Sequence, residues 1–170
     1  SRGLGDVYKR QAQRWPAATF DSLFARAMLQ ADRVREAAAQ SPQLSLITSQ
    51  VELNQLLARR ARGEAVVGAL LGTEGSHALD GQLNNIDQLY DAGFRMMGLH
   101  HFFDNRLGGS LHGESQAGLT PFGEQAVRNM QKKGIMIDVA HSSEATVRAT
   151  LRVTDCLLYT SPSPRDNTTS

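Results

Sequence analysis

The chain has 170 residues, of which 41% are hydrophobic and 21% charged, a balance typical of one soluble globular domain. Its 18 Lys and Arg residues nearly offset 17 Asp and Glu residues, and the net charge of +1 gives no field that would attract nucleic acid or an anionic membrane. The single cysteine, Cys156, excludes an internal disulfide and a thiolate metal cage. No stretch of about 18 apolar residues predicts a transmembrane segment.

The two ends of the chain differ in composition from the middle. Residues 1–11 contain the sequence GDVYKRQ, and residues 155–170 are rich in Pro, Ser, Thr and Asp and have no periodicity. Both segments resemble read-through of sequencing adapters, so we interpret them as non-native or disordered; a natural tail is the alternative for the second. The genuine protein is then expected to span 12–154 and to be truncated at both ends.

Helix and strand patterns alternate along the middle of the chain. Helices are predicted over about 18–40, from a Ser49 and Glu52 capping box to Gly63, from Asp80 to Gly93, from Thr120 and Pro121 to Gly134, and from Ser142 or Ser143 onward. Strands are predicted over 44–48, 65–73, 95–99 and 135–140. The apolar run AVVGALLGT at 65–73 is typical of a strand buried on both faces.

This alternation predicts an α/β fold with a parallel sheet and about four β/α units. Two architectures remain open, a doubly wound sheet and part of a (β/α)8 TIM barrel. No G-x-G-x-x-G follows any predicted strand, so the best indication of a dinucleotide-binding fold is missing. A whole barrel needs about 250 residues, and the barrel interpretation therefore requires truncation.

Polar side chains follow three of the predicted strands. Glu74 follows the second strand, His100 and His101 follow the third, and His141 follows the fourth. The carboxyl ends of parallel strands are where such folds place their sites, and Glu and His are suitable ligands for zinc. Because side chains alternate along a strand, only one of His100 and His101 should enter the site, and His101 shares its face with Leu99.

Each of these residues also has a structural interpretation. Glu74 could be an exposed turn residue, His141 could neighbour a helix cap, and His101 could lie in the core. His77, His100 and His112 are predicted to be structural or solvated. The pair His112 and Glu114 has ligand-like spacing, but its position in a glycine-rich loop makes it a weak indication.

Four segments of the chain resemble the membrane dipeptidase family of zinc peptidases, in its bacterial branch. They are GTEGSHAL at 72–79, LYDAGFRMMGLHHFFDN at 89–105, GLTPFGEQAVRNM at 118–130 and KGIMIDVAHSS at 133–143. The resemblance implies an amidohydrolase-type barrel that hydrolyses dipeptides with water activated by two zinc ions. It further implies that Glu74 bridges the two ions, that His141 binds one of them, and that His101 contacts the substrate and polarises the scissile carbonyl. A homodimer is possible for the full-length form.

The sequence also departs from the family pattern. The family's H-x-D pair occurs nowhere in this chain, and a further His and a later Asp would lie beyond Thr154. About two of the expected metal ligands are present, so this polypeptide alone is predicted to be inactive.

Two other functions remain open at this stage. The residues at the strand ends would also suit another metal-dependent amidohydrolase, acting on non-peptide amides or lactones. A non-catalytic α/β module is the third interpretation, and it predicts that replacing Glu74 and His141 has no effect on function.

Overall fold

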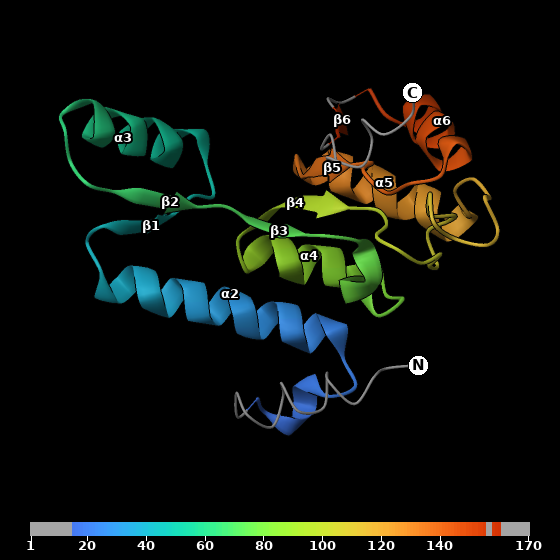
Figure 1. Ribbon diagram of the computed structural model, residues 1–170, viewed down its shortest axis with the longest axis horizontal. Helices are drawn as coiled ribbons and strands as arrows, with labels where there is room; N and C mark the ends of the chain where they lie inside the picture. Colours follow the sequence, from blue (N-terminus) through green and yellow to red (C-terminus); the bar gives the residue numbers. More distant parts are fainter. Residues whose placement is uncertain (1–14, 156–157, 161–170) are drawn as a thin grey trace, which may run out of the picture.

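The computed structural model describes residues 15–155 and 158–160 (Figure 1). The predicted non-native segment 1–11 lies outside the described residues, as does most of 155–170. The helices are η1 (Ala17–Thr19), α2 (Leu23–Gln40), α3 (Gln50–Ala61), η2 (Ser76–Leu79), α4 (Asn84–Asp91), α5 (Pro121–Lys133) and α6 (Glu144–Val153). The strands are β1 (Leu44–Leu46), β2 (Val67–Ala69), β3 (Leu71–Thr73), β4 (Phe94–Gly98), β5 (Met136–Asp138) and β6 (Leu158–Tyr159).

All paired strands run parallel, as the alternation of helices and strands predicted. β1 pairs with β2, and a four-stranded sheet has the order β3-β4-β5-β6. Each strand of this sheet pairs with the next one along the chain, and the order does not reverse among the described strands. The α/β prediction is confirmed, and the strand order is consistent with part of a β/α barrel. Leu158 and Tyr159, which were excluded from the predicted fold, form the last strand of this sheet.

The prediction of one strand over 65–73, buried on both faces, is wrong. The segment forms β2 and β3, which belong to different sheets, and Val67 and Leu70 are 59% and 53% exposed. Side chains alternate along β2, so Val66 packs with Ile47 and Leu56 under α3 while Val67 faces away. Helix α3 covers only one face of the β1–β2 pair. The segment 65–73 is therefore apolar but not buried on both faces.

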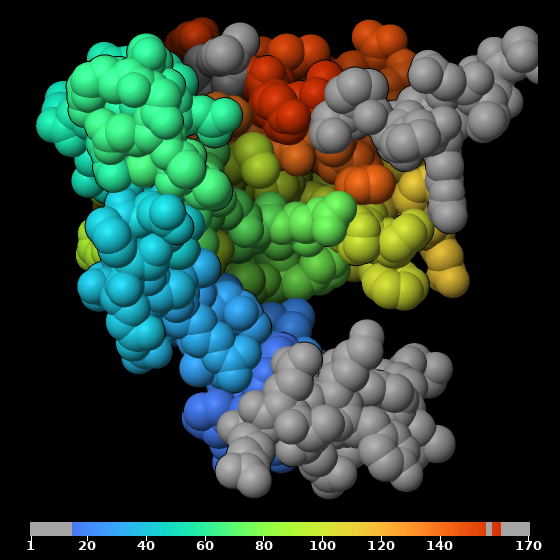
Figure 2. Space-filling model, turned by 60° about the vertical axis from the view of Figure 1, so that its left-hand side comes forward, coloured from blue at the N-terminus to red at the C-terminus, as the bar shows by residue number. Residues whose placement is uncertain are grey.

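Most buried apolar side chains belong to one core between the four-stranded sheet and its helices. We call this part, β3–β6 with α2, α4, α5 and α6, the body of the molecule. Its core residues are Ala31, Leu79, Ile86, Leu89, Ala92, Phe94, Met97, Leu99, Leu107, Ala126, Val127, Met130, Ile135, Ile137 and Val139. Residues 44–69 form a separate lobe of β1, α3 and β2, which lies at the opposite end of the molecule from α6 (Figure 1) and comes forward in Figure 2.

The predicted starts of α2 and α4 are both wrong, and the position of Asp80 explains both differences. The first long helix begins at Leu23 instead of near residue 18, with Ser22 as its N-cap. Asp80, predicted to cap the helix after it, has a φ of +46° and turns its carboxylate toward α2. That carboxylate accepts hydrogen bonds from the amides of Leu23 and Phe24 at 3.2 and 3.3 Å. Asp80 therefore caps α2 across 57 residues of chain, and α4 begins at Asn84 without it.

The predicted N-caps Thr120 and Ser49 are confirmed, and of the two alternatives Ser142 and Ser143 the cap is Ser143. The Thr120 hydroxyl accepts a hydrogen bond from the amide of Gly123, and the Ser143 hydroxyl accepts one from Thr146. Ser49 caps α3, but the Glu52 carboxylate accepts from the amide and hydroxyl of Thr48 at 2.7 and 2.9 Å. These bonds hold the pKa of Glu52 below its ordinary value. Within the described part of the chain, no helix combines the length and the hydropathy needed to cross a bilayer.

Candidate metal site

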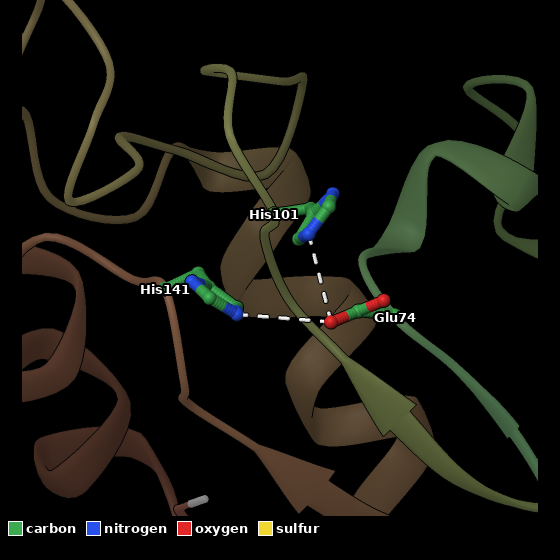
Figure 3. A group of neighbouring side chains, drawn as sticks. All are labelled: Glu74, His101 and His141. Atoms are coloured by element: carbon green, nitrogen blue, oxygen red, sulfur yellow. Dashed lines mark ion pairs between the residues drawn. The ribbon is translucent and has the colours of Figure 1, made fainter. Parts of the chain in front are cut away.

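The structure brings together three residues that sequence analysis selected at strand ends. Glu74 directly follows β3, and His101 and His141 lie three residues beyond β4 and β5. The Nε2 atoms of His101 and His141 lie 3.5 and 3.7 Å from the same carboxylate oxygen, Oε1 of Glu74 (Figure 3). The two imidazole rings meet edge to face with their centroids 5.0 Å apart. Residues 27 and 67 positions apart from Glu74 along the chain therefore converge on one oxygen atom.

The close approach of Glu74 and His101 depends on two glycines, Gly75 and Gly98. A β-carbon on Gly98 would lie 2.9 Å from the amide nitrogen of Gly75 and 3.0 Å from the carbonyl oxygen of Thr73. Gly75 itself has a φ of +92°, a conformation that side chains disfavour. Ser76 then donates its hydroxyl to the carbonyl of Gly98 at 2.8 Å. The ends of β3 and β4 thus touch backbone to backbone, which sets the carboxylate of Glu74 beside the ring of His101.

His100 points away from this group, as the alternation of side chains predicted. It is 1% exposed, and its Nδ1 atom lies 3.0 Å from the hydroxyl of Ser142. Burial lowers the pKa of His100 to about 4, so its ring is neutral at pH 7. Ser142, one of the two predicted helix caps, serves this contact instead, and Ser143 is the cap.

The three converging side chains are open to solvent to different extents. Glu74 is 70% exposed, whereas His101 and His141 are 33% and 24% exposed. The carboxylate thus lies at the surface, and the imidazoles lie behind it at the rim of the sheet. A small ligand can reach all three without any opening of the core.

The donor set and its spacing fit a divalent cation. Among the described residues, this is the one group of three such side chains whose ligand atoms all lie within 4.8 Å of one another. Zinc bonds of about 2.0–2.2 Å in tetrahedral geometry place ligand atoms about 3.3–3.6 Å apart, close to the two distances at Glu74. Two imidazoles and one carboxylate also leave a fourth position open, which is typical of catalytic zinc sites. These residues could therefore hold one metal ion after small side-chain adjustments.

Residues 102–118 bring further groups to the site that sequence analysis did not select. The ring of Phe102 lies 4.3 Å from that of His101, and the ring of His112 lies 6.0 Å from that of His141. For His112, the sequence offers only the ligand-like spacing to Glu114, which is a weak indication in a glycine-rich loop. Phe102 and the buried Ser110, whose hydroxyl donates to the backbone carbonyl of His101, carried no signal. Loop residues have no periodicity from which the direction of their side chains can be predicted.

A comparison with protein families identifies the chain. A family model described as membrane dipeptidase, peptidase family M19, matches residues 10–165. The chain belongs to the membrane dipeptidase family. Dipeptidase 3 of Mus musculus is 32% identical over 143 residues, a match that covers 75% of this chain and 25% of that protein. The chain thus spans about a quarter of the length of this membrane dipeptidase relative.

Solved structures show the same fold. An amidohydrolase from Pseudomonas aeruginosa superposes with a TM-score of 0.66 at 20% identity, covering 75% of this chain and 38% of that one. A metallo peptidase from Rhodobacter sphaeroides, liganded with a phosphinate mimic of the dipeptide L-Ala-D-Ala, has a TM-score of 0.63 at 19% identity over 76% and 37% of the two chains. The membrane dipeptidase family and the amidohydrolase-like fold therefore agree with the sequence-based expectation.

Proposed function

We propose that this chain forms part of a metal-dependent dipeptidase. The observation that carries the proposal is the convergence of Glu74, His101 and His141 at the ends of three adjacent parallel strands. Membership in the membrane dipeptidase family supports the reaction class. The same geometry would suit other hydrolytic metal sites, so it is the family that favours the peptide bond over a lactone or a cyclic amide.

Glu74 and His141 are the metal ligands in this proposal, and zinc is the proposed ion. Their atoms lie 3.7 Å apart, a distance that one cation can bridge. The resemblance implies two zinc ions, with Glu74 shared between them. A second ion would require donors in addition to the group of three that the described residues form here.

His101 is proposed to contact the substrate. When bound, a divalent ion would polarise the scissile carbonyl and lower the pKa of a nucleophilic water. The Nε2–H group of His101, at the same rim, would donate a hydrogen bond to the carbonyl oxygen as negative charge develops there. Removing one such donor typically lowers turnover about 100- to 1,000-fold. Phe102, which packs on the His101 ring, would limit how far that ring can turn.

The test combines metal binding with hydrolysis. Because the chain spans about a quarter of the relative it matches, hydrolysis is assayed on the 170-residue chain and also on the complete reading frame of its gene. We expect zinc-dependent cleavage of a dipeptide panel by the product of the complete frame, and loss of cleavage in Glu74→Ala. The 170-residue chain is expected to bind zinc without measurable turnover.

Two outcomes would contradict this proposal. One is cleavage of cyclic amides or lactones by the complete product without cleavage of any dipeptide. The other is dipeptide cleavage that chelators do not affect.

A homodimer of the full-length form belongs to the same proposal, and sedimentation of the complete product checks it.

A further inference from the structure

We infer that Ser110 is a positioning residue, whose hydroxyl sets the distance between the two imidazoles of the candidate metal site. The inference deepens the proposed function, on which its metal-binding part rests. Ser110 lies in the loop between β4 and α5 and is 0% exposed. It contacts neither Glu74 nor an imidazole ring through any hydrogen bond found in the structure, so it would act through the backbone of His101 and His141.

One hydroxyl connects the backbones of both histidines. The Ser110 Oγ atom lies 2.5 Å from the carbonyl oxygen of His101 and 3.0 Å from that of His141. A hydroxyl carries a single proton, so this proton is shared between two carbonyl groups. Without it, the carbonyl of His101 would lose this donor, and the two carbonyl groups would no longer share a hydrogen-bonding partner. The hydroxyl therefore holds together two residues that are 40 positions apart along the chain.

The backbone of His141 is held in an unusual conformation at the same place. Its φ is +62°, in the left-handed region that residues other than glycine seldom adopt. Its carbonyl accepts a second hydrogen bond from the amide of Leu111 at 2.8 Å. Strained backbone of this kind persists where the surroundings fix it, and here Ser110 and Leu111 supply both bonds. A relaxed His141 backbone would turn the imidazole away from Glu74.

Ser110 is itself fixed from outside the site. Its amide donates to Oδ1 of Asp104 at 2.8 Å, and Oδ2 of the same carboxylate accepts from the amide of Ser115 at 2.9 Å. Ser110 also pairs with Ser142 in an isolated antiparallel bridge beside His141. The loop thus presents the hydroxyl from a rigid support. Ser110 is the last residue of a buried stretch, 107–110, and the exposed residues Leu111 and His112 follow it.

The experiment measures the two imidazoles directly in the 170-residue chain. In the metal-free protein, nuclear Overhauser contacts between the ring protons of His101 and His141 are recorded for the wild type, Ser110→Ala and Ser45→Ala. Affinity for Co²⁺ and the visible spectrum of the Co²⁺ complex are then measured for the same proteins and for Glu74→Ala. Ser45 is the control, because it is a half-buried serine of β1 in the lobe, away from the candidate metal site.

We expect Ser110→Ala to lose the contacts between the rings, to bind Co²⁺ about 10- to 100-fold more weakly and to show an altered visible spectrum, as is typical when groups that orient ligands are removed. Ser45→Ala should match the wild type in all three measurements. A serine with a purely structural role would lower the unfolding midpoint but leave the ring contacts and the spectrum of the folded protein unchanged. That result would overturn the inference.

Two further measurements keep the inference separable from folding and from the proposed function. If Ser110→Ala does not fold, Ser110→Cys replaces it, because a thiol of similar size is a weaker donor, and the ring contacts should weaken in the metal-free protein. Unchanged contacts in that variant would contradict the inference. If the wild type binds no Co²⁺, the proposed metal site fails, and the ring contacts alone decide the role of Ser110.

Discussion

The lobe at 44–69 and the body of the molecule are built from the same alternation of strand and helix, yet they bury very different amounts of apolar surface. Among the described residues, the lobe core consists of Ile47, Leu56 and Val66, each 6–7% exposed. The body encloses fifteen such residues, and several of them are completely buried. All three side chains of the candidate metal site lie just beyond the carboxyl ends of β3, β4 and β5 in the body. The comparison teaches that rigid strand ends, and not the βα pattern alone, bring distant donors together.

The largest effect on stability is expected in the body core. Leu89 on α4 is 0% exposed, so Leu89→Ala should lower the free energy of unfolding by about 2–5 kcal/mol. Urea unfolding followed by circular dichroism measures it. Leu57→Ala, at a 54% exposed position on α3, is the control and should change the same quantity by less than about 0.5 kcal/mol. Equal losses from the two variants would remove the distinction between the regions.

The next effect concerns metal binding and separates two exposed carboxylates. Glu74→Ala should weaken zinc binding by at least about 100-fold, since loss of a ligand exceeds the roughly 10- to 100-fold effect of groups behind ligands. Glu64→Ala is the matched control in the lobe, where the carboxylate pairs with Arg59 and Arg62 at the surface. Isothermal titration with zinc distinguishes them. Similar losses in both variants would show that the ion binds elsewhere.

A smaller effect tests whether the lobe is energetically separate. Leu56→Ala empties most of its small core and should cost about 2 kcal/mol, the low end for such substitutions, because a solvent-facing site collapses easily. Hydrogen exchange should then increase for the amides of α3 and stay unchanged for those of α5. Loss of protection throughout the chain would mean that lobe and body unfold as one unit.

The smallest effect is one of pH, and each region contributes one carboxylate. Amide hydrogen bonds hold the pKa of Glu52 below 4.5 and that of Asp104 below 3.8. A carboxyl group whose pKa is lowered on folding stabilises the folded state above its unfolded pKa, and this contribution disappears as the pH falls through the lower folded value. Amide shifts of Thr48 and Ser115 should therefore be constant above pH 5 and change below about pH 4. Glu52→Gln should abolish the change at Thr48 alone.

The sequence was informative wherever a local rule determines the structure. Thr120 before a proline and Gly134 after a helix are caps that depend on backbone groups of the adjacent turn, and the structure confirms both. Of the two alternatives Ser142 and Ser143, the structure has Ser143 as the cap. The facing of His100 and His101 followed from the alternation of side chains along a strand. Glu74, His101 and His141 were found because parallel strands bring their carboxyl ends to the same edge.

The predictions that failed concern contacts between distant segments. Asp80 has the residue type of a cap, but the helix it caps lies 57 residues earlier in the chain. The run at 65–73 is uniformly apolar, and only the pairing partners on each side divide it into two strands. Nothing in the sequence around Ser110 predicts that its hydroxyl contacts the backbone carbonyl groups of His101 and His141. Local periodicity and spacing do not predict such contacts, because they depend on which distant segments the tertiary fold brings together.

The proposed ion site has a consequence for the sheet that carries it. Its two proposed ligands, Glu74 and His141, lie beyond the carboxyl ends of β3 and β5, and the paired registers of these strands with β4 end before reaching them. A cation held by these two side chains would link the carboxyl ends of β3 and β5 across the intervening strand β4. An unfolded chain holds no such arrangement, so the thermal midpoint should climb with zinc concentration and drop on dialysis against a chelator.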